Sequence, residues 1–301
     1  LLGSSQLSRG GFCPIATSQA RPPMPTSWTV WLEHRGVAAA FAFIGGFSDV
    51  ISVERYGAFA TMCTGNTIMA GRTLADPKKS LVDVLFYFII IACFFGGAVL
   101  FHVVSLRCPQ RAATYLGAVM AIVVIVCEVA QRYIVDVAVV GLEVVEIRNA
   151  YRWTVCGIAP LFGVVCAASS CGNLATTTTM ISGHVLALSK IAVKWSHEGV
   201  DRDKCWITTS SIVVILFSVL GAAAGAAAFY LTGGQTDWMF VPVAVLLALV
   251  LAAYDGLPKL HPDHIHIHQS LLELCGADSE TETAAAEEDQ AYEIVKCESS
   301  V

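Results

Sequence analysis

The polar residues best suited to chemistry in this chain lie within apolar sequence. Asp49 stands in the apolar stretch Gly36–Tyr56, and the triplet "TGN" at residues 64 to 66 follows it closely. A carboxylate near the centre of a bilayer costs roughly 2.5 to 3.5 kcal/mol on insertion scales. A neighbouring polar side chain, a basic group, a bound proton or water in a cavity must compensate that cost. The first candidates for a solute-binding site are therefore Asp49, Thr64, Gly65 and Asn66.

A second polar segment, "SGH" at residues 182 to 184, repeats the first. Shifting the sequence by 118 residues superposes Thr61 on Thr179, Gly65 on Gly183 and Thr64 on Ser182. A segment that recurs within one chain indicates duplication of a structural unit. We expect Ser182, Gly183 and His184 to converge with the first group near mid-membrane, where His184 would titrate near neutral pH.

The same residue types also have a packing interpretation. Small and polar residues join membrane helices through close contact and interhelical hydrogen bonds. We favour that interpretation for Thr61, Thr67 and the run "TTTT" at residues 176 to 179, and for Gly221 with Gly225 in "GAAAGAAA". For Asp49 with Asn66 both interpretations stay open.

Composition indicates a membrane protein. The 301 residues are 55% hydrophobic and 14% charged, with a mean hydropathy of +0.65. A helix needs about 20 mostly apolar residues to cross a bilayer. The windows that approach this length are Gly36–Tyr56, Leu81–Leu106, Thr114–Ala130, Val155–Leu174, Ile207–Leu231 and Met239–Ala253. Glu128, near the end of its window, is expected to snorkel to the interface.

These windows predict an all-α membrane bundle of about six transmembrane helices in two three-helix repeats. The two triplet segments are too polar to face lipid alone and are expected to form additional short half-helices. Three crossings per repeat make the repeats inverted, whereas four would make them parallel. Hydropathy favours three. The predicted boundaries are a membrane domain at 36–258 with repeat one at 36–131, a linker at 132–153 and repeat two at 154–258.

The flanking regions differ from the membrane domain in composition. The chain begins with Leu rather than Met, so we expect its start to be missing or processed. Residues 1–35 are predicted to be a disordered arm, with a transit-peptide remnant as the alternative. Residues 259–301 form a tail, whose part from Leu271 onward holds nine Asp or Glu and one Lys and is expected to be disordered. With the N-terminus inside, 11 Lys or Arg fall on the cytoplasmic side and 7 outside, which favours both termini in the cytoplasm.

A dense histidine segment, "HPDHIHIHQS", follows the last window. It brings together imidazole and carboxylate groups that zinc or copper accepts as ligands. The alternative is a solvated loop beside the membrane. The candidate metal ligands are His261, Asp263, His264, His266 and His268.

The sequence carries no pattern that names a reaction. It has no P-loop, no G-x-S-x-G elbow and no H-E-x-x-H motif, so we expect neither enzymatic activity nor a cofactor. No basic patch indicates nucleic-acid binding, and the expected partners are the lipid bilayer and a small solute or ion. Two functions compete: a secondary carrier, or a non-transporting scaffold or interaction protein whose polar segments pack helices. An intramembrane enzyme is a distant third.

The first polar stretch resembles the signature of the YoaK-like family of small integral membrane proteins, a group of unknown function. That family shows a Gly-aromatic-x-Asp element, which Gly46, Phe47 and Asp49 match, and a TGN element shortly afterwards. The resemblance covers about residues 36 to 258 and implies a multi-pass membrane fold without naming a reaction. The second repeat departs from the family, which tends to show Gly-x-Gln-Asn where this chain has "GVVC", residues 163 to 166.

Overall fold

A computed structural model describes residues 28–138, 151–171, 174, 178, 181–198, 202–234 and 238–257. These residues form eight helices and no strand, which confirms the predicted all-α class. The helices are α1 (Trp28–Tyr56), α2 (Cys63–Ala75), α3 (Leu81–Arg107), α4 (Ala112–Ala138), α6 (Val155–Cys171), α7 (Ile181–Glu198), α8 (Arg202–Leu231) and α9 (Phe240–Asp255).

Four of the described helices are long and apolar enough to cross a membrane: α1, α3, α4 and α8. Shorter apolar helices occur at 155–170, 181–193 and 240–255. The outer faces of the long helices are apolar as well, since Phe88, Phe95, Ile122 and Leu216 are all exposed. Exposed apolar surface on this scale is typical of a lipid-facing bundle rather than of a soluble domain. The chain is therefore a multi-pass membrane protein.

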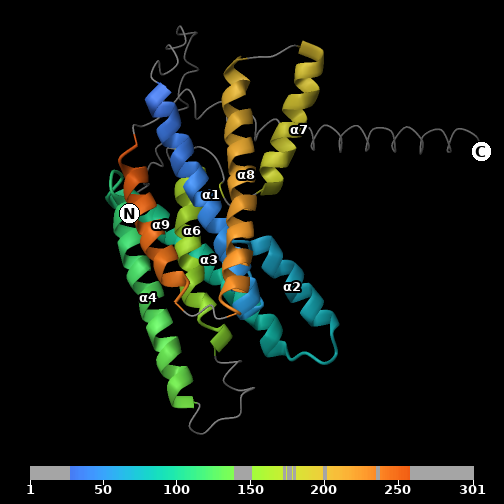
Figure 1. The fold of residues 1–301 in the computed structure, drawn as a ribbon, viewed down its shortest axis with the longest axis vertical. Helices are drawn as coiled ribbons and strands as arrows, with labels where there is room; N and C mark the ends of the chain where they lie inside the picture. Colours follow the sequence, from blue (N-terminus) through green and yellow to red (C-terminus); the bar gives the residue numbers. More distant parts are fainter. Residues whose placement is uncertain are drawn as a thin grey trace, which may run out of the picture.

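The bundle is built from antiparallel neighbours. Figure 1 shows α1, α3, α4, α6, α8 and α9 side by side, with successive members running in opposite directions. α1 begins and α9 ends toward the same, upper end of the view. α2 and α7 begin near mid-height on one flank, and they run toward opposite ends of the bundle. With 13 residues, α2 spans only about 20 Å and is too short to cross the hydrocarbon.

Two helix crossings are so close that only glycine fits. A methyl group at Gly46 of α1 would overlap the backbone carbonyl of Ser218 in α8. A methyl group at Gly163 of α6 would likewise overlap the carbonyl of Phe94 in α3. Close backbone approach through small residues is how membrane helices gain packing contacts. α1 with α8 and α3 with α6 thus form two tight pairs.

The predicted packing role of Gly221 and Gly225 is confirmed. A Cβ at Gly221 would overlap the carbonyl of Phe43, and one at Gly225 would lie 2.8 Å from the carbonyl oxygen of Phe47. Both glycines therefore face α1 and let α8 approach its backbone.

Glu128 does not snorkel to the interface, and that prediction is wrong. The residue is 2% exposed, and its carboxylate pairs with Arg55, whose Nη1 lies 2.8 Å from Oε1. The backbone N–H of Trp238 also donates to Oε2, at 3.3 Å. A position near the end of an apolar window favours snorkelling when only the sequence is considered. The end of α1 instead brings a guanidinium beside it, which compensates the buried charge.

Candidate solute-binding pocket

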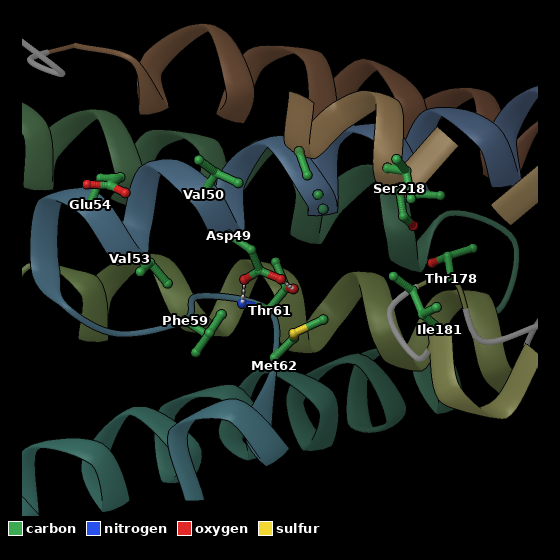
Figure 2. Close-up of a pocket in the computed structure, with 15 residues that line it drawn as sticks. Asp49, Val50, Val53, Glu54, Phe59, Thr61, Met62, Thr178, Ile181 and Ser218 are labelled. Atoms are coloured by element: carbon green, nitrogen blue, oxygen red, sulfur yellow. Dashed lines mark hydrogen bonds between the residues drawn. The ribbon is translucent and has the colours of Figure 1, made fainter. Parts of the chain in front are cut away.

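Asp49 lies on α1 inside the bundle and is 8% exposed. Its Oδ1 accepts a hydrogen bond from the backbone N–H of Thr61 at 3.0 Å, and its Oδ2 accepts one from the Thr61 hydroxyl. Figure 2 shows both bonds at the centre of the pocket. A carboxylate offers about four acceptor positions, so two remain for a further partner.

A tight turn after α1 brings Thr61 back to Asp49. α1 ends at Tyr56, and Gly57 adopts a φ of 68°, a left-handed conformation that suits glycine. The hydroxyl of Ser52 then accepts a hydrogen bond from the N–H of Ala60 at 3.0 Å. The Ser52 side chain thus holds the segment after α1 against the helix, one residue before Thr61.

Asn66 holds the same turn from its other side. Its Oδ1 accepts from the N–H of Phe59 at 2.9 Å, and its Nδ2 donates to the Phe59 carbonyl at 2.7 Å. The amide thereby satisfies both backbone groups of a residue that no helix pairs. Asn66 is 2% exposed and acts as a brace for the turn that carries Thr61.

A pocket of about 330 Å³ opens beside Asp49. Its walls come from α1, from the turn that follows it, from the start of α7 and from α8. Most of the lining side chains are apolar or small, and the acidic ones are Asp49 and Glu54. Among the described residues that line the pocket, none is Lys, Arg or His. The lining residues drawn and labelled in Figure 2 are Asp49, Val50, Val53, Glu54, Phe59, Thr61, Met62, Thr178, Ile181 and Ser218.

Thr178 supplies a polar group to the side of the pocket formed by the second half of the chain. It is 2% exposed, and its hydroxyl has no hydrogen-bond partner among the residues that the structure describes. Figure 2 shows this hydroxyl on the side of Thr178 that faces Asp49. A buried hydroxyl without a partner is costly, so a group that enters the pocket would relieve it.

The first predicted group is only partly gathered at the pocket. Asp49 lines it, as expected for a site residue. Asn66 is engaged by Phe59, and Thr64 is exposed. Gly65 packs under the Phe59 ring, because a Cβ at this position would lie 2.5 Å from a ring carbon. Thr64, Gly65 and Asn66 thus support the turn or face outward, and they do not line the pocket.

The second predicted group also lies beside the pocket rather than in it. Ser182 and Gly183 are exposed, and a Cβ at Gly183 would meet nothing within 4 Å. His184 is 5% exposed and faces α8, with its Nδ1 3.0 Å from the hydroxyl of Ser211. The start of α7 nevertheless reaches the pocket through Ile181.

Sequence reasoning missed Thr61, Thr178 and Ser218 as pocket residues. For both threonines the sequence favours a role in helix packing. One signal could have found them: a shift of 117 residues, one less than the 118 of the sequence comparison, places Asp49 on Cys166 and Thr61 on Thr178, so each threonine lies 12 residues after its reference residue. The equal spacing indicates that the two threonines occupy matching places in the two halves.

The predicted metal ligands His261, Asp263, His264, His266 and His268 lie outside the described residues. Their metal binding stays a prediction. Within the described part of the chain, no group of three or more His, Cys, Asp or Glu is arranged to hold a metal ion.

The family model described as "Protein of unknown function (DUF1275)" matches residues 37–253. The chain belongs to DUF1275. This membership agrees with the YoaK-like resemblance of the first polar stretch. The match runs from α1 to α9, so the pocket and both glycine crossings lie within the part that DUF1275 describes. No curated protein and no solved structure matches the chain.

Proposed function

We propose that this DUF1275 chain is a secondary carrier that moves a small solute through the pocket beside Asp49. One observation carries the proposal: a buried carboxylate lines a cavity whose walls come from both halves of the chain. Ionisable residues inside a membrane are expensive, and they typically mark solute or proton pathways. In this role Asp49 takes up a proton or a cation while the solute occupies the pocket.

An inverted duplication supports the carrier. Gly46 meets the carbonyl of Ser218, and Gly163 meets that of Phe94. Gly163 lies 117 residues after Gly46, and Ser218 lies 124 residues after Phe94. In the structure, Gly163 of the second half therefore corresponds to Gly46 of the first half. The sequence comparison, with its shift of 118 residues, pairs Gly163 with the neighbouring Gly45 instead.

Each crossing also has a glycine on its other helix, and these two glycines give the same offsets. Gly221 meets the carbonyl of Phe43, and Gly97 meets that of Pro160. Pro160 lies 117 residues after Phe43, and Gly221 lies 124 residues after Gly97. The four close approaches of the two crossings thus follow one pair of shifts. This agreement supports two copies of one unit in which α6 corresponds to α1 and α8 corresponds to α3.

The directions of the helices support inversion of the two copies. In Figure 1 α6 runs opposite to α1, α8 runs opposite to α3, and α7 runs opposite to α2. Inverted repeats with interrupted helices are a recurrent plan of secondary transporters, in which one repeat rocks against the other around a central site. Three crossings per copy place both chain ends on one side. The excess of Lys and Arg, 11 against 7, supports a cytoplasmic location for that side.

A non-transporting scaffold is the second candidate, and one observation favours it. Asn66 makes its hydrogen bonds to Phe59, as a packing device would. The scaffold also requires that polar groups be satisfied inside a dry bundle. The Thr178 hydroxyl beside the pocket has no partner among the described residues and does not meet that requirement, and we therefore prefer the carrier.

Uptake into reconstituted vesicles tests the carrier. The purified chain is placed in liposomes, and a panel of labelled cationic, neutral and anionic solutes is offered with and without an imposed pH gradient. We expect at least one solute to enter faster than in protein-free liposomes, and we expect Asp49→Asn to abolish this uptake. Glu33→Gln is the matched control, because Glu33 is an exposed acid on the same helix. Equal uptake by wild type and Asp49→Asn would contradict the proposal.

A further inference from the structure

We propose that the pocket binds a small organic monocation, with its charged nitrogen on the Asp49 carboxylate and a hydrogen bond to the Thr178 hydroxyl. The inference rests on the proposed function and names the chemical class of its solute. It follows from the charge of the pocket, from its apolar wall and from the Thr178 hydroxyl, which has no partner within the described part of the chain.

Charge selects a cation. The two ionisable side chains that line the pocket are both acids: Asp49 is buried, and Glu54 is exposed. Among the described lining residues no basic side chain opposes them. An anionic solute would meet repulsion here without a compensating partner, whereas a cation offsets the cost of burying Asp49.

The apolar wall selects an organic ion over a bare metal ion. Around Asp49 the pocket presents Val50, Phe59, Met62 and Ile181. Calcium takes six to eight oxygen ligands, and magnesium requires six in an octahedron. None of these four side chains carries an oxygen, and the side-chain oxygens of the lining are divided among Asp49, Glu54, Thr61, Thr178 and Ser218. An alkyl group bound to the charged nitrogen would instead bury its carbon against these side chains.

Two polar groups fix the position of the charged nitrogen. Thr61 occupies one acceptor position on each carboxylate oxygen of Asp49 and leaves the others free. Thr178 faces the pocket with a buried hydroxyl that has no partner among the described residues. An ammonium group carries several N–H donors, so one that is bonded to Asp49 has others left for the side of the pocket where Thr178 lies.

The size of the pocket limits the solute. A volume of about 330 Å³ lies at the lower end of the range for small-molecule sites, which is roughly 300 to 1,000 Å³. This space suits an amine with a short carbon chain.

Binding of a matched series to the full chain in detergent tests the inference. The probes are butylammonium, butanol and butyrate, which share a short alkyl chain and differ in charge. Isothermal titration calorimetry measures each one. We expect butylammonium to bind and the other two to bind at least tenfold more weakly. Sodium chloride at matched ionic strength controls for a general salt effect.

Two variants locate the binding site. Asp49→Asn and Thr178→Val are each expected to weaken butylammonium binding about tenfold or more, because the first removes the counter-charge and the second removes a hydrogen bond to a charged group. Thr64→Val is the matched control, since Thr64 is exposed and lies outside the pocket. Thr178→Val keeps the shape of the side chain. If Asp49→Asn does not fold, butylammonium binding by Thr178→Val alone tests the inference. Unchanged butylammonium binding in Thr178→Val and in a folded Asp49→Asn would overturn the inference.

The results separate the inference from the proposed carrier. Uptake of a neutral or anionic solute that depends on Asp49, without butylammonium binding, would overturn the cation inference and leave the carrier standing. Asp49-dependent binding of butylammonium without uptake of any solute would support the inference and contradict the carrier.

Discussion

Arg55 at the end of α1 and Glu128 of α4 form an ion pair inside the bundle. Nη1 lies 2.8 Å from Oε1, and the two side chains are 3% and 1% exposed. The Arg55 Nε also donates to the Tyr151 hydroxyl at 3.2 Å. Arg55 Nη1 donates to Oε1 of Glu128 and Nη2 donates to Oε2. This bidentate arrangement is the strong form of an Arg–carboxylate pair. The pair therefore joins α1, α4 and the segment that enters α6.

Breaking this pair should strongly destabilise the chain. Glu128→Ala leaves the Arg55 guanidinium buried without its main counter-charge, which typically costs about 3–5 kcal/mol. Unfolding in detergent by chemical denaturant should show this loss, and Glu33→Ala at an exposed position should change stability by less than about 0.5 kcal/mol. The double variant Arg55→Met with Glu128→Met should recover most of the loss. Equal stability of Glu128→Ala and Glu33→Ala would contradict the role of the pair.

Two neighbouring glycines of α1 should respond very differently to alanine. Gly46→Ala forces a methyl group against the Ser218 carbonyl, and overpacking of this kind typically costs about 1–3 kcal/mol. Gly45→Ala meets nothing within 4 Å and should be neutral or slightly stabilising, because alanine is the better helix former. Thermal unfolding of the two variants gives the comparison. A Gly46→Ala protein as stable as Gly45→Ala would show that the α1–α8 crossing is looser than described.

Asn66→Ala should lower the stability of the chain, because Asn66 supports the turn after α1 and does not line the pocket. It removes the side-chain partner of both backbone groups of Phe59, and an unsatisfied buried group costs about 1–3 kcal/mol. Thr64→Ala, two residues earlier on an exposed face, should have little effect. Denaturant unfolding distinguishes the variants. If Asn66→Ala keeps full stability but loses uptake, Asn66 binds solute directly, as its sequence context first indicated.

The histidine segment should bind divalent metal independently of transport. Replacing His261, His264, His266 and His268 with Ala removes the imidazole ligands that zinc prefers. Calorimetric titration of the full chain with zinc should show weak binding that this fourfold variant loses, while solute uptake is unchanged. Equal heats from both proteins would remove the metal site, and lost uptake would place the segment on the transport path.

The sequence alone determined the class of the molecule and its most informative residue. Apolar windows of membrane-spanning length predicted the helical bundle, because backbone groups in lipid must be satisfied within a helix. Asp49 was found for a related reason: a carboxylate within such a window is costly wherever its helix lies. Both conclusions depend only on the local sequence and on the properties of the lipid bilayer, so neither needs knowledge of tertiary contacts.

Only the tertiary structure decided the partners of the polar residues. Asn66 bonds to Phe59, Glu128 pairs with Arg55, and Thr178 reaches the pocket of Asp49. Spacing along one helix defines a face, but it does not say which other helix packs against that face. Arg55 and Glu128 are 73 residues apart, and Asp49 and Thr178 are 129 apart. Their meeting depends on the close α1–α8 and α3–α6 crossings and on the turn that returns the chain after α1, because a hydrogen bond forms only between groups that packing brings within about 3 Å.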